Sequence, residues 1–191
     1  MRIPDKQAIF FELDGVLVRE ARLDENDRVP WFEGALDALA ACDPSIFTLL
    51  IGTNRSDIAF GKLRERDFKR FCTQFLEDCE ARGIQIRKIY SCPFHPKGHK
   101  RYRKDSVFRK PAPGIYKMAQ QEFDLNLSRC WAIGHTTVDT LAGNRAGMGT
   151  MLMETGAAGQ DGEYHIEPHR TARDLRDAML QIHEFESAMR C

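Results

Sequence analysis

Four short segments of the chain carry side chains that can do chemistry, at residues 12–14, 53–56, 109–110 and 135–139. Three of them directly follow an apolar run. Their carboxylate, hydroxyl, ammonium and imidazole groups are the kinds that bind anions or metal ions and transfer protons. Whether they form one site depends on the elements that position them.

Apolar periodicity separates strands from helices along the chain. Short apolar runs that end in glycine or charged turns indicate buried strands. Apolar residues at three- and four-residue steps within 64–82 indicate an amphipathic helix, which Gly83 ends. Strands are expected over 8–11, 46–51, 84–90, 130–133 and 150–153. Helices are expected over 31–41, 64–82, 113–123, 138–146 and 171–189, with a loop over 92–110.

Alternating strands and helices predict an α/β fold, a Rossmann-like, doubly wound and mainly parallel sheet flanked by helices. Ligands bind such sheets at the carboxyl ends of the strands, where the chemically competent segments lie. We expect one domain over residues 1–191, with motifs within 7–155 and a C-terminal strand and helix within 164–190. No insertion after Gly15 or between Gly61 and Arg109 is long enough for a lid domain, so we expect a capless fold.

In their order along the chain, these segments resemble the four motifs of the haloacid dehalogenase (HAD) superfamily of phosphohydrolases. The matching strings are FELDGVL at 11–17, GTNRS at 52–56, KP at 110–111 and IGHTTVD at 133–139. Three longer strings are more specific, namely TNRSDIAFGK at 53–62, YSCPFHP at 90–96 and RKPAPG at 109–114. They resemble the histidinol-phosphatase and D,D-heptose 1,7-bisphosphate phosphatase branch.

The resemblance implies a role for each matching position. Glu12 stands where the family has its nucleophilic aspartate, and Asp14 fills the acid/base position two residues later. The phosphate-binding positions are filled by Thr53, Asn54, Arg109 and Lys110. The metal positions, at which the family binds Mg²⁺, are filled by Glu12, Asp14, His135 and Asp139.

Two of these positions depart from the family pattern. Glutamate is one methylene longer than aspartate, and a misplacement of about 1 Å can reduce a rate about 100-fold. His135 replaces an aspartate, although Mg²⁺ strongly prefers oxygen ligands. We therefore expect Mg²⁺ binding to be weakened, or Mg²⁺ to be replaced by a softer ion such as Mn²⁺ or Zn²⁺.

A structural zinc site is predicted to be absent. The heptose branch often closes its long loop with cysteine and histidine ligands, and here only Cys92 is kept. Phe94 stands at the histidine position, while Ser106 and Phe108 stand where later cysteines are expected. One thiol cannot make a four-ligand site. Phe94 and Phe108 are expected to replace the metal by packing against each other.

Composition limits the partners and the compartment. Lys and Arg total 28, equal to Asp and Glu, so no global charge attracts nucleic acid, which we regard as an improbable partner. A basic run over 97–110 is interpreted either as a solvated loop or as a rim that guides an anionic substrate. No apolar run is long enough to span a membrane. Six scattered cysteines without a CxxC pair favour reduced thiols and a cytoplasmic protein.

Two functional hypotheses remain. The first is a phosphatase that hydrolyses a small phosphate monoester, a sugar phosphate or an amino-alcohol phosphate. The second is a catalytically impaired pseudo-phosphatase that binds a phosphorylated ligand or a protein partner. The preserved motif frame supports the first hypothesis, and the changes at Glu12 and His135 support the second.

Overall fold

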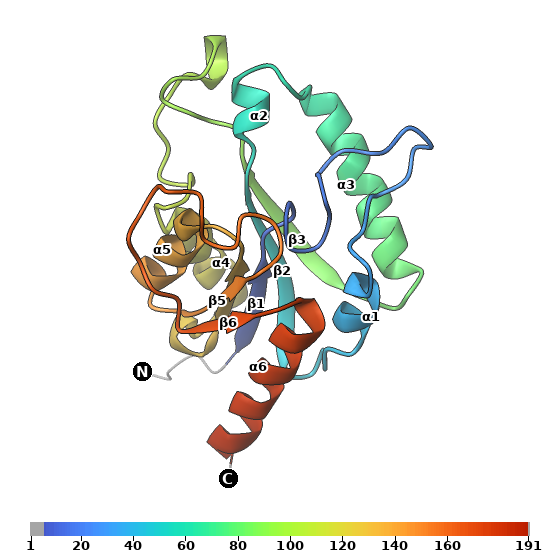
Figure 1. Ribbon diagram of the computed structural model, residues 1–191, viewed down its shortest axis with the longest axis vertical. Helices are drawn as coiled ribbons and strands as arrows, with labels where there is room; N and C mark the ends of the chain where they lie inside the picture. Colours follow the sequence, from blue (N-terminus) through green and yellow to red (C-terminus); the bar gives the residue numbers. More distant parts are fainter. Residues whose placement is uncertain (1–5, 191) are drawn as a thin grey trace.

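A computed structural model describes residues 6–190 of the chain and places six strands of this part in one sheet (Figure 1). The strand order is β3-β2-β1-β4-β5-β6, and each neighbouring pair is parallel. The strands are β1 (Gln7–Phe11), β2 (Phe47–Asn54), β3 (Ile86–Cys92), β4 (Trp131–Gly134), β5 (Gly149–Met153) and β6 (Arg170–Ala172). The predicted parallel α/β fold is confirmed, with β1 between β2 and β4.

Helices cover both faces of this sheet (Figure 1). They are α1 (Ala35–Ala40), α2 (Ser56–Ala59), α3 (Glu65–Glu80), α4 (Gly114–Phe123), α5 (Thr137–Ala146) and α6 (Leu175–Arg190), with 3-10 turns η1 (Lys100–Tyr102) and η2 (Leu127–Arg129). Successive side chains of a strand point to opposite faces. Ile9 and Phe11 of β1 therefore join the core under α1, α3 and α6. Ala8 and Phe10 join the core under α4 and α5.

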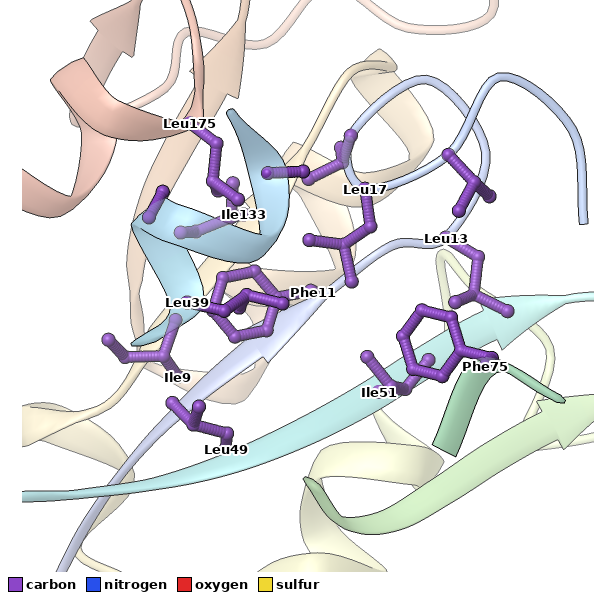
Figure 2. Packing of buried hydrophobic residues seen from close by; sticks show 14 of the residues in the cluster. Ile9, Phe11, Leu13, Leu17, Leu39, Leu49, Ile51, Phe75, Ile133 and Leu175 are labelled. Carbon is purple, nitrogen blue, oxygen red and sulfur yellow. The ribbon is translucent and has the colours of Figure 1, made fainter. Parts of the chain in front are cut away.

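Figure 2 shows the first of these cores, where Phe11 of β1 and Ile51 of β2 lie on the same side of the sheet as Leu39 and Phe75. Each of these side chains is at most 1% exposed. The tightly packed strands fix the position of the residues that follow them. The carboxyl end of β1, where Glu12 lies, is therefore held from both sides of the sheet.

The first helix is shorter than the predicted span of 31–41. Trp31 forms an antiparallel bridge with Val18, and its ring stacks on Phe75 with 4.7 Å between the ring centres. Its indole nitrogen donates a hydrogen bond to Asp78 at 2.8 Å. The apolar character of Trp31 thus reflects packing against α3, and α1 begins only at Ala35.

The C-terminal segment contains the expected strand and helix, but with different bounds. Residues 170–172 extend the sheet as β6, and the helix begins at Leu175, four residues later than the predicted start at 171. A strand of three residues gives too little alternation to be distinguished from the start of the helix. None of the helices within residues 6–190 is long and apolar enough to cross a membrane.

Candidate active site

A buried lysine joins three segments at the carboxyl end of the sheet. The Lys110 ammonium lies 2.6 Å from Glu12 Oε2 and 2.6 Å from Asp139 Oδ1, and it donates to the Gly52 carbonyl at 2.8 Å. Lys110 is 1% exposed and Glu12 is 8% exposed. One lysine thus bridges the carboxylate after β1 and the carboxylate on α5.

Thr53 completes the contacts of Glu12. The Thr53 hydroxyl, at the end of β2, donates a hydrogen bond to Glu12 Oε1. The same oxygen accepts from the Leu13 backbone N–H at 2.8 Å. Because β1 and β2 are parallel neighbours, their carboxyl ends bring these residues together across 41 positions of sequence.

Asp139 is held by the first turn of its own helix. Its Oδ2 accepts from the Thr136 hydroxyl at 2.8 Å and from the Thr136 and His135 N–H groups at 3.2 Å, in a capping box. Gly134 makes this approach possible, because a Cβ there would lie 2.2 Å from the Asp139 Cβ. Asp139 Oδ1 is thereby aimed at Lys110.

The two carboxylates that share the lysine differ in their electrostatics. Burial lowers the pKa of Lys110, but the charges of Asp139 and Glu12 outweigh it, so the net pKa is above its ordinary value. Burial also raises the pKa of Asp139, yet Lys110 and Thr136 outweigh it and lower the net value. For Glu12, burial prevails over Lys110, and the pKa is raised. Asp139 is therefore firmly ionised, whereas the anionic form of Glu12 is disfavoured.

Asn54 and Arg109 act on the backbone of Lys110. The Asn54 amide donates to the Lys110 carbonyl and accepts from the Lys110 N–H, both at 2.9 Å. Arg109 donates to the same carbonyl at 3.1 Å. Both residues were predicted to bind phosphate, and here both position the lysine. Their direct contact with phosphate stays a prediction.

Asp14 is held by a residue that sequence reasoning missed. Its Oδ2 accepts from the guanidinium of Arg55, and its Oδ1 accepts from the Ala21 N–H at 2.5 Å. Arg55 is 6% exposed and follows directly after β2. A cation at the carboxyl end of a buried strand was the signal that could have identified it.

His135 lies between two glycines and is half-buried. A Cβ at Gly15 would lie 2.7 Å from its ring, and a Cβ at Gly156 would lie 2.5 Å from its Nδ1. Gly15 has φ +74°, a conformation that glycine favours. His135 Nδ1 accepts the Ala157 N–H at 2.9 Å, and its carbonyl accepts the Gly159 N–H at 2.8 Å. His135 therefore anchors the loop after β5 to the turn after β1.

The predicted metal ligands do not fit a Mg²⁺ ion in this arrangement. Both carboxylate oxygens of Glu12, Asp14 and Asp139 accept hydrogen bonds from protein donors, and so does His135 Nδ1. Within residues 6–190, no group of three or more His, Cys, Asp or Glu side chains is arranged to hold a metal ion. The oxygen-rich set that Mg²⁺ requires is thus engaged by the protein itself.

In the loop over 92–110, Phe94 and Phe108 have other neighbours than the predicted packing against each other. Cys92 is a buried free thiol. The Phe94 ring lies 6.4 Å from the Tyr102 ring, and the Lys104 ammonium lies 3.9 Å above it. Phe108 instead packs on the core under α4 and α5. The two phenylalanines belong to different clusters, because the loop turns back on itself between them.

A parallel α/β sheet with carboxylates and a lysine meeting at its carboxyl edge is the arrangement of a phosphatase-like protein. A HAD-hydrolase-like family model matches residues 107–178. The D-glycero-alpha-D-manno-heptose-1,7-bisphosphate 7-phosphatase of Burkholderia mallei is 33% identical over 149 residues, 77% of this chain and 79% of that protein. The corresponding beta-heptose enzyme of Pasteurella multocida is 31% identical over 153 residues, 79% of this chain and 83% of its own length.

A solved structure has the same fold. The D,D-heptose 1,7-bisphosphate phosphatase of B. bronchiseptica, crystallised with magnesium and phosphate, superposes with a TM-score of 0.80 at 24% identity. The match covers 94% of this chain and 99% of that one. The chain belongs to the HAD superfamily, in the branch of the heptose bisphosphate phosphatases. The resemblance noted in the motifs is confirmed.

Proposed function

We propose that the chain is a slow phosphoric monoester hydrolase for a small phosphorylated metabolite, a sugar phosphate or an amino-alcohol phosphate. The convergence of Glu12, Thr53 and Lys110 at adjoining strand ends supports this proposal. The relatives are named for a heptose bisphosphate, a phosphorylated sugar of the same class. A cytoplasmic location is part of the proposal, in keeping with the five free cysteines among the described residues.

Each side chain has a defined part in this reaction. The Glu12 carboxylate attacks phosphorus as the P–O ester bond breaks, and the leaving oxygen takes a proton from Asp14. Water then gives a proton to Asp14 and attacks the acyl phosphate at phosphorus, so that the bond between phosphorus and the Glu12 oxygen breaks and inorganic phosphate leaves. Lys110 and Thr53 offset the charge on the phosphoryl oxygens. The extra methylene and the raised pKa of Glu12 both slow the attack.

The Arg55–Asp14 ion pair favours a second candidate, a pseudo-phosphatase that binds a phosphorylated ligand or a protein partner. An acid/base residue must release and regain a proton during the reaction. The Arg55 guanidinium donates to Asp14 Oδ2, so this oxygen is already engaged by the protein and is less available for that exchange. On this reading the cluster is kept for structure and ligand binding, with no turnover.

A panel of sugar phosphates, amino-alcohol phosphates and heptose 1,7-bisphosphate distinguishes the two candidates. Phosphate release is measured with Mg²⁺, Mn²⁺ and Zn²⁺ for the wild type, for Asp14→Asn and for the double variant Glu12→Asp/His135→Asp. We expect weak wild-type turnover that Asp14→Asn abolishes. We expect the double variant to be at least about 100-fold faster, because both changes restore the family pattern.

Two outcomes decide against the proposal. A silent wild type together with an active double variant supports the pseudo-phosphatase instead. Wild-type turnover that survives Asp14→Asn removes Asp14 from the chemistry and requires a different acid. Arg70→Gln serves as the matched control, since Arg70 pairs with Asp27 at 2.7 Å on an exposed surface.

A further inference from the structure

Arg55 is a buried cation with an unusual environment. Its side chain is 7% exposed, it contacts Asp14 Oδ2, and its Nε lies 3.3 Å from Asp57. Its guanidinium carbon lies 5.3 Å from the centre of the Phe68 ring. Nη1 is buried and has no hydrogen-bond partner. Few of the N–H groups of this guanidinium have a hydrogen-bond partner. Its burial is therefore offset mainly by the charges of the neighbouring carboxylates.

Two cations of the protein offset part of the negative charge of the site. Three carboxylates, those of Glu12, Asp14 and Asp139, meet two cations, Lys110 and Arg55. Asp57 also pairs with Arg55, so four carboxylates surround the two cations, and two negative charges are in excess when all four carboxylates are ionised. Without Arg55, three would be in excess, so Arg55 offsets part of the negative charge that would attract a divalent cation. Burial lowers the pKa of Arg55, but Asp14 and then Glu12 outweigh it, so the guanidinium stays charged.

We propose that Arg55 takes the electrostatic place of a divalent cation in this site and so excludes Mg²⁺ from the carboxylate cluster. It is a positioning residue, because it acts through its contact with Asp14. The inference rests on the site of the proposed function but not on turnover, since it concerns metal affinity alone. His135 stands at a predicted metal position but holds the loop after β5 instead. The Arg55 guanidinium then supplies positive charge that stabilises the carboxylates.

The proposal is tested on the full chain by measuring the Kd of metal binding. Mg²⁺ binding is measured by calorimetric titration, and Mn²⁺ binding by electron paramagnetic resonance. The proteins are the wild type, Arg55→Gln, Arg55→Lys and the surface control Arg70→Gln. We expect Arg55→Gln to bind Mg²⁺ with a Kd at least about tenfold lower than the wild type, because a nearby positive charge is removed. Arg55→Lys keeps the charge and should bind metal as weakly as the wild type and the control.

A folded Arg55→Gln variant whose metal affinity equals that of the wild type overturns the proposal. So does an increase in affinity for Arg55→Lys as large as that for Arg55→Gln, because the effect would then depend on shape. If Arg55→Gln is unfolded in metal-free buffer, Mg²⁺ at millimolar concentration should restore its circular dichroism spectrum and its thermal transition. Unfolding that neither Mg²⁺ nor Mn²⁺ reverses also overturns it. Phosphate release does not enter any of these outcomes, so they remain valid if the proposed hydrolysis fails.

Discussion

The two ends of strand β1 each carry a buried carboxylate pairing, but of different kinds. At the amino end, the Gln7 amide and the Arg129 guanidinium both donate to Glu186 Oε2 of α6, at 3.1 and 3.2 Å. At the carboxyl end, Glu12 and Asp139 share one lysine. Glu186 is 4% exposed and Glu12 is 8% exposed, so the carboxylates at both ends are buried.

The difference shows which pairing serves the fold. The amino-end contact ties α6 and η2 to the sheet with one carboxylate and a partly exposed arginine. The carboxyl end instead buries two carboxylates against one ammonium. Removing one partner of a buried ion pair is strongly destabilising, and apolar residues of similar volume could pack there without that risk. A structural need explains the first arrangement. The second arrangement serves the hydrolysis that we propose for this site.

The largest effect in this comparison is expected for Lys110→Met. The variant leaves two buried carboxylates without their cation and should lower the free energy of unfolding by about 3–5 kcal/mol. Urea unfolding at neutral pH measures this difference. The exposed lysine Lys97 provides the control, and Lys97→Met should change the stability by less than about 0.5 kcal/mol. Equal losses in the two variants would show that Lys110 has no special electrostatic role.

A smaller effect is expected at the amino end. Glu186→Gln keeps an oxygen that can accept from Gln7 but loses the charge that pairs with Arg129. The free energy of unfolding should fall by about 1 kcal/mol, the magnitude of a single hydrogen bond. The same urea experiment measures it. A loss as large as that of Lys110→Met would remove the proposed contrast between the two ends of β1.

The smallest effect is a pH dependence that Glu12→Gln should remove. Because the folded pKa of Glu12 is raised above 4.5, its contribution to stability is present below that pH and is lost as the pH rises through the folded value. The stability of Glu12→Gln relative to the wild type should therefore increase between pH 4.5 and neutrality. Unfolding in urea at several pH values checks this. A relative stability that stays constant or decreases over this range would mean that the pKa of Glu12 is not raised.

Much of the site could be predicted from the sequence because its residues follow recognisable strand ends. Glu12, Thr53 and Asp139 were placed by the apolar runs before them and by the motif spacing. Arg55 was not identified, although it adjoins Asn54, because nothing in the local pattern indicates which carboxylate a long side chain reaches. His135 was assigned as a metal ligand from its position, yet its orientation depends on glycines at 15 and 156.

The sequence by itself determined the order of strands and helices, the parallel α/β fold and the family. These follow from local periodicity and from motifs that occupy contiguous positions. Only the tertiary structure decided how charges pair, that Lys110 bridges two carboxylates and that Arg55 holds Asp14. The physical reason is that ion pairing in a buried site depends on distances between residues tens of positions apart. Those distances are set only when the sheet and both of its cores have packed.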